Sequence, residues 1–359
     1  MEQLRIIRCF NEALIEFPMS VLTVDVQQPV EKPRPASRIE ALDWTKGALV
    51  LCMVVYHAIN YSAFRPMAFK FLAFLPSSFI LIAGFLVGQV YAAKYDSKTW
   101  KPYLRLAVRG FKLFVLFLVL NVTFCIILER NFLYGILEFS DRSNAIFLSG
   151  NGREGIFEVL LPIAYFLLLA PALLWLRSRV SGAVIFCAAG IFLLCVALEM
   201  NGLFYKNLSL LSAGFLGMAC GLIPIASIDR FARQWLLVLG VYAFYRLCSY
   251  FVGEIYVVQM LGALTSLALL YACALHLDCA STFGRQMVMF GRYTLLGYLV
   301  QIPLIQIIVY IFGGKPNHWI GVSIVTVVAT ALLFVIVLAV DGLRRRNRFI
   351  DLSYKSIFA

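Results

Sequence analysis

The chain has 359 residues, of which 62% are apolar and only 14% charged, and its formal net charge at pH 7 is +12. Soluble domains carry about 45–50% apolar and about 25% charged residues, so the composition excludes both an ordinary soluble globular protein and a disordered chain. A multi-spanning membrane protein is the class that remains.

The first 40 residues are the most polar stretch of the chain. No apolar h-region follows Arg5 and Arg8, which argues against a signal peptide. We expect residues 1–40 to form a mostly disordered cytoplasmic tail.

Ten apolar runs follow this tail, each about as long as the 20 residues that a helix needs to cross a bilayer. The runs are continuously apolar, without the alternation of β-barrel strands. The expected fold class is therefore all-α, a polytopic membrane helix bundle of about ten transmembrane helices. The runs are approximately 45–63, 69–93, 106–128, 156–176, 181–199, 208–228, 232–252, 255–276, 293–312 and 320–341.

Lys and Arg in the connections predict the orientation. With the N-terminus in the cytoplasm, 23 of these residues fall on the cytoplasmic side and seven on the other, with Arg246 left inside a span. We therefore expect both termini to be cytoplasmic, and the charge needs no nucleic acid to explain it. The predicted domains are the tail 1–40, a transmembrane domain 41–343 and a basic cytoplasmic tail 344–359.

The longest outer connection runs from Glu129 to Gly155 and is rich in charge. It is either a cover for a substrate mouth or a plain surface loop. The nine cysteines show no metal-ligand spacing, and no Walker, HExxH or GxSxG motif is present, so we predict no metal site.

Ionisable residues inside spans are costly and are candidates for function. His57 lies twelve residues after Thr45, roughly 18 Å along the first span, where it is either a general base or a histidine hydrogen-bonded within the bundle. Asp43 is placed to cap this helix, and Lys46 either snorkels to headgroups or helps to form a polar entry for an anionic cofactor.

Arg105, Arg109 and Lys112 follow at i, i+4 and i+7, on one face of the third span. This stripe could grip phosphates or anchor the helix to lipid phosphates. Arg246 in the seventh span could form a structural ion pair with Glu158 or Glu254. Gln301 and other buried amides could simply bridge helices.

Four segments, together with the tail VDGLRRRNRFIDLSYKSIFA (340–359), resemble the acyltransferase-3 superfamily of integral membrane acyltransferases, in its OpgC-like glucan succinyltransferase branch. The first carries a basic residue and a histidine separated by ten residues, which here are Lys46 and His57. The segments are RIEALDWTKGALVLCMVVYHAINY (38–61), FILIAGFLVGQVYAAKY (79–95), RGFKLF (109–114) and GRYTLLGYLVQIPLI (291–305).

The resemblance implies transfer of an acetyl or succinyl group from acyl-CoA to a hydroxyl of an extracytoplasmic glycan, in the inner membrane. It implies that His57 and Asp43 act in catalysis, and that Lys46, Arg105, Arg109 and Lys112 bind the acyl-CoA. Arg246 and Glu158 would then face the glycan. Two departures stand out: Lys46 replaces the usual arginine, and Gln301 occupies the position of a late histidine.

A membrane transporter or flippase for an acyl or glycan intermediate is the alternative, with His57 and Arg246 serving a proton-coupled cycle. The sequence shows no paired Gly/Pro-interrupted spans in two matching halves, which disfavours this alternative.

Overall fold

The computed structural model describes residues 39–63, 71–92, 100–129, 132–150, 157–253, 255–277, 279 and 281–358. Two units compose the chain, residues 1–39 and 40–359, and every described helix lies in the second. The tail expected over residues 1–40 falls almost entirely outside the described residues.

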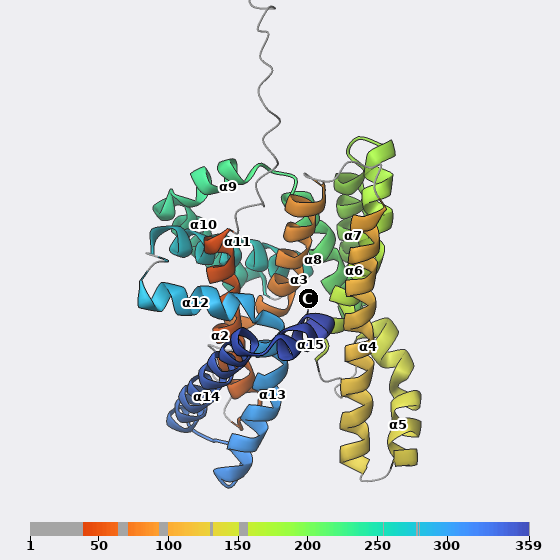
Figure 1. Cartoon of the computed structure of the whole chain (residues 1–359). Coiled ribbons are helices and arrows are strands. Elements are labelled where there is room, and N and C mark those ends of the chain that lie inside the picture. Colours follow the sequence, from red (N-terminus) through yellow and green to blue (C-terminus); the bar gives the residue numbers. More distant parts are fainter. Residues whose placement is uncertain are drawn as a thin grey trace, which may run out of the picture. The chain divides into compact units, whose positions relative to one another are not determined.

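Fourteen α-helices and two short π-helices make up the described part of the chain, which contains no strand, so the all-α prediction is confirmed there (Figure 1). The α-helices are α2 (Glu40–Asn60), α3 (Leu75–Leu86), α4 (Lys101–Glu129), α5 (Phe132–Asn144), α6 (Leu160–Arg179), α7 (Ala183–Met200), α8 (Lys206–Cys220), α9 (Ile225–Ala232), α10 (Trp235–Val252), α11 (Tyr256–His276), α12 (Thr282–Arg292), α13 (Thr294–Ile311), α14 (Trp319–Arg346) and α15 (Arg348–Phe358). The π-helices are η3 (Val87–Ala92), which continues α3, and η4 (Ala145–Ser149), which continues α5.

Eight of the described helices are long and apolar enough to cross a membrane, namely α2, α4, α6, α7, α10, α11, α13 and α14. The predicted run 208–228 is broken into α8 and α9, which meet at 100° and would make a ninth span if counted as one. Gly221 and Pro224 stand at this break, and proline lacks the N–H that a continuous helix needs. The run 69–93 yields the shorter apolar helix Leu75–Tyr91. A multi-span membrane bundle is therefore supported, whereas the count of ten and the cytoplasmic termini stay predictions.

Three helices lie where the sequence predicts connections or a tail. α5 lies beside α4, so that part of the long connection after Glu129 is a helical hairpin (Figure 1). α12 and α15 are strongly amphipathic, which keeps their mean hydropathy too low for a span. Residues 344–346, expected in the C-terminal tail, belong to α14.

α2 is the central helix of the bundle. It contacts α3, α11, α12, α13 and α14, and 67% of its most apolar stretch is buried, more than in any other of the eight described spans. α12 crosses its first turns at two glycines: a Cβ on Gly47 would strike the carbonyl oxygen of Met287, and one on Gly291 that of Asp43. The backbones therefore touch directly, which fixes the residues at the start of α2.

A second glycine contact joins α3 to α8. A Cβ on Gly84 would strike the carbonyl oxygen of Gly214, and a Cβ on Gly217 that of Leu81. Gly88 and Gly221 extend the contact by one turn, with their Cα atoms beside each other. Small residues spaced by about four allow such close approach, which is a main source of helix association in membranes.

Substituting Gly217 by valine should therefore lower the melting temperature of the purified protein, because the backbone carbonyl of Leu81 cannot rotate away. Overpacking of this kind costs about 1–3 kcal/mol. Gly190→Ala in α7 is the matched control, since nothing lies within 4 Å of the added Cβ. Equal melting temperatures for both variants and the wild type would contradict the contact.

The C-terminal helix is held by a polar network around Arg344. Its guanidinium donates to Asp351 Oδ1 at 2.7 and 3.0 Å and to the Tyr293 hydroxyl at 2.9 Å, and it stacks 3.9 Å from the Tyr354 ring centroid. Lys355 Nζ adds an ion pair to Asp351 Oδ2 at 2.5 Å. These contacts dock α15 against α14 and the start of α13.

Docking of α15 should weaken in acid. Lys355 and Arg344 hold the pKa of Asp351 below its ordinary value of 3.8, so their stabilisation is present above that pH and is lost as pH falls through the lowered pKa. Hydrogen exchange over residues 348–358, corrected for its intrinsic pH dependence, should show lost protection in strong acid. Asp351→Asn should lack protection at neutral pH too. Unchanged wild-type protection below pH 3.8 would refute the network's role.

Candidate functional site

A pair of unsatisfied polar side chains lies where α2 packs against α13. Within the described residues, both ring nitrogens of His57 are buried without a hydrogen-bond partner, and so are the amide nitrogen and oxygen of Gln301. His57 is flanked by the rings of Tyr56 and Tyr61, at centroid distances of 5.3 and 6.4 Å. The alternative interpretation, a histidine hydrogen-bonded within the bundle, therefore finds no partner for His57 among the described residues.

The register of the two helices brings His57 and Gln301 to one interface. A Cβ on Gly297 would lie 2.9 Å from Val50 Cγ1, and Gln306 Nε2 donates to the Tyr61 hydroxyl at 3.1 Å, so α2 and α13 run parallel. His57 lies seven residues after Val50, and Gln301 four after Gly297, spacings that keep each on the face of its helix turned to the other. At 1.5 Å per residue, they differ by roughly 5 Å in height, or about one turn.

An unsatisfied polar atom in a buried site costs about 1–3 kcal/mol. Four such atoms at one interface are an expensive arrangement for purely structural packing, because apolar residues would pack there at no such cost. The α2–α13 interface is therefore the strongest candidate for chemistry in the described structure.

Asp43 and Lys46 form an ion pair at the start of α2. Lys46 Nζ lies 2.5 Å from Asp43 Oδ1, and the side chains are 16% and 4% exposed. The helix begins at Glu40, so Asp43 lies in its first turn, and the prediction that it caps the helix is wrong. Because Asp43 balances its charge, Lys46 attracts a phosphate less than an unpaired lysine would.

The predicted stripe on α4 lines a pocket of about 530 Å³. Arg105, Arg109 and Lys112 are joined there by Lys101, one turn earlier, and by Tyr91 from η3. None of the described residues that line it is acidic. Lys101 was not among the predicted site residues, although its spacing of four from Arg105 is the signal that could have identified it.

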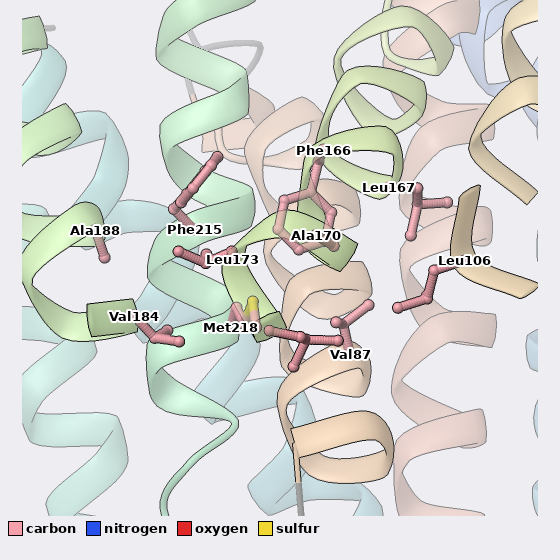
Figure 2. Close-up of a cluster of buried hydrophobic side chains, with 11 residues drawn as sticks. Val87, Leu106, Phe166, Leu167, Ala170, Leu173, Val184, Ala188, Phe215 and Met218 are labelled. Atoms are coloured by element: carbon pink, nitrogen blue, oxygen red, sulfur yellow. The ribbon is translucent and has the colours of Figure 1, made fainter. Parts of the chain in front are cut away.

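A buried apolar cluster holds the stripe against the rest of the bundle. This cluster contains Leu106 of α4, Val87 of η3, Phe166 of α6, Val184 of α7 and Met218 of α8 (Figure 2). Leu106 lies between Arg105 and Arg109 in the sequence. It is buried in the cluster, whereas both arginines are exposed. The pocket is therefore part of a firmly packed region.

Arg246 lies apart from the other two candidate sites, the His57 interface and the α4 pocket. Its guanidinium stacks on the Phe71 ring at 3.9 Å, and it lines a pocket of about 420 Å³ with Phe74, Tyr245 and Gln259. The expected partner Glu158 pairs with Lys206 instead, so that alternative is wrong. Glu254, the other predicted partner, lies outside the described residues.

α3 and η3 together form one continuous helical rod over residues 75–92. This rod reaches all three candidate sites: the Arg246 pocket, the His57 interface and the α4 pocket. Phe74, just before α3, lines the Arg246 pocket, and Tyr91 of η3 lines the cation pocket. These residues are 17 positions apart, roughly 25 Å at 1.5 Å per residue. Between them, Phe79 contacts Tyr298, three residues before Gln301, with ring centroids 6.3 Å apart. The two pockets therefore lie near opposite ends of the rod, with the His57 interface between them.

No group of three or more His, Cys, Asp or Glu residues in the described part of the chain could hold a metal ion. Comparison of the chain with protein-family models, with curated proteins and with solved structures finds no match in any of the three. The resemblance to the acyltransferase-3 superfamily therefore stays a prediction.

Proposed function

We propose that the protein is an integral membrane acyltransferase that moves an acetyl or succinyl group from acyl-CoA to a hydroxyl of an extracytoplasmic glycan, in the inner membrane. The observation that carries the proposal is the buried imidazole of His57, whose nitrogens have no hydrogen-bond partner in the described part of the chain. An imidazole that accepts no internal hydrogen bond is available to take a proton from a substrate hydroxyl.

The donor would bind through its phosphates at the α4 pocket. Guanidinium groups bind phosphate by paired hydrogen bonds, and two of the four cations there are arginines. We assign this task to Lys101, Arg105, Arg109 and Lys112. Lys46 is held by Asp43, and we assign that pair to positioning the start of α2.

In the transfer step, His57 takes the proton of the acceptor hydroxyl, and the oxygen attacks the thioester carbonyl carbon. The carbon–sulfur bond breaks, and the thiolate takes the proton from the imidazolium to leave as free CoA thiol. The products are one ester and one thiol. In the second version of the step, His57 carries the acyl group between donor and acceptor. Gln301, which cannot titrate, would donate a hydrogen bond to one of the reacting groups.

A transporter or flippase is the second candidate, and one observation favours it. α8 and α9 form a broken helix with a 100° bend, and discontinuous helices are common at transporter binding sites. The sequence shows no paired interruptions in two matching halves, and there is one bent pair among the described helices. Release of free thiol from acyl-CoA by the purified protein distinguishes the two, since a transporter leaves the thioester intact.

His57→Ala should lower the rate of acyl transfer by about 10²–10⁴-fold, because the step loses its proton acceptor. Thiol release by purified protein and mass spectrometry of the cell's glycans would both measure it. His276→Ala is the matched control, since His276 lies at the end of α11 with its Nδ1 against the Ala272 carbonyl. Full glycan modification by a normally inserted His57→Ala protein would rule out this assignment.

Replacing Arg105 and Arg109 together by glutamine should raise the KM for acyl-CoA by about tenfold and leave kcat nearly unchanged. Both side chains are exposed, so each contributes a modest, screened interaction with phosphate. Arg177→Gln with Arg179→Gln, at the end of α6, is the control for loss of two membrane-anchoring charges. If both double variants behave alike, the α4 stripe is a lipid anchor.

A further inference from the structure

The Arg246 pocket combines a cation with aromatic walls. Phe71 and Phe74 come from the turns just before α3, and Tyr245 and Tyr250 come from the second half of α10. Arg246, Ser249 and Gln259 add polar groups to these walls. The pocket is thus built for a ligand with both polar and apolar parts.

Arg246 brings a positive charge into this pocket, and no described wall residue carries a negative one. Among the described residues, no lining residue is acidic and the buried Nε of Arg246 has no hydrogen-bond partner; Glu254, which follows the lining residue Gly253, lies outside them. Stacking on Phe71 fixes the guanidinium plane and leaves its N–H edge to bind something else. Since a guanidinium stays charged at any physiological pH, an anion is the group that complements it.

The surroundings indicate where this anion comes from. Tyr250 lines the pocket and is itself 80% exposed, and Leu247 and Phe251 beside it on α10 are exposed too. In a bilayer these apolar side chains face lipid. The pocket therefore borders the hydrocarbon region, and a ligand can enter it sideways with its tail still in the membrane.

We propose that this pocket binds the phosphate group of a membrane amphiphile, in the leaflet at the Gly253 end of α10. Lateral entry suits a lipid-borne phosphate, and the guanidinium fork suits phosphate geometry. The further step, that the acceptor glycan is carried on such an amphiphile, rests on the proposed function; the binding itself does not.

Two short-chain lipids that differ only by the phosphate test the proposal: dioctanoyl phosphatidic acid and dioctanoylglycerol. The full chain is purified in an uncharged sugar detergent, and each lipid is titrated while the melting temperature is recorded. Phosphatidic acid should raise the melting temperature of the wild type, and dioctanoylglycerol should not. Arg246→Gln should weaken the phosphatidic acid response by about tenfold or more, since it removes the charge-assisted bonds.

Two further variants serve as controls for this test. Arg179→Gln removes an arginine that also stacks on an aromatic ring, Trp175 at 5.5 Å, but lies outside the pocket, and it should leave binding unchanged. Arg246→Lys keeps the charge without the planar fork and should bind with intermediate strength, which covers the case that the glutamine variant folds poorly.

Three results would overturn the proposal: equal binding by Arg246→Gln and wild type, equal binding of the two lipids, or the same stabilisation by inorganic phosphate alone at matched concentration. The last result would mean a free-anion site. The assay contains no acyl donor, so its failure is distinct from failure of the proposed function. A protein that binds phosphatidic acid but never releases thiol would refute acyl transfer and leave the pocket standing.

Discussion

Close backbone contact between helices is the constraint on which the rest of the structure depends. Inside a bilayer the hydrophobic effect does not drive apolar helices together, so their association relies on close packing at small residues. Gly47 and Gly291 bring α2 against α12, and Gly84 and Gly217 bring α3 against α8. The first contact fixes the start of the helix that carries His57. The second fixes the rod that reaches from one pocket to the other.

The sequence predicts those parts of the fold whose signals are local. Continuous apolar runs identify the span helices, and spacing along one helix finds the α4 stripe, which does line a pocket. α12 and α15 are amphipathic and lie below the hydropathy of a span, so a search for apolar runs passes over them. The break between α8 and α9 is also hidden, because the residues around Gly221 and Pro224 stay apolar on average.

Pairings between distant helices are the part that the sequence cannot supply. Glu158 pairs with Lys206, 48 residues away, and nothing in either segment excludes Arg246 as the partner. The unsatisfied state of His57 is likewise a property of all its neighbours together, and only packing reveals it. Asp43 shows the opposite case: its link to Lys46 is predictable from a spacing of three, but its place in the helix depends on where the helix begins.

The shared rod of α3 and η3 has a thermodynamic consequence. A ligand at the Phe74 end and a ligand at the Tyr91 end both contact one continuous helical segment. If occupancy of one pocket shifts this segment, linkage requires that the change in affinity be reciprocal and equal in free energy. The η3 turns, which are wound more loosely than α-helix, are where such a shift could be absorbed, since π-helical turns are often found at functional positions. Cooperativity between the two pockets would then be a property of a single helix.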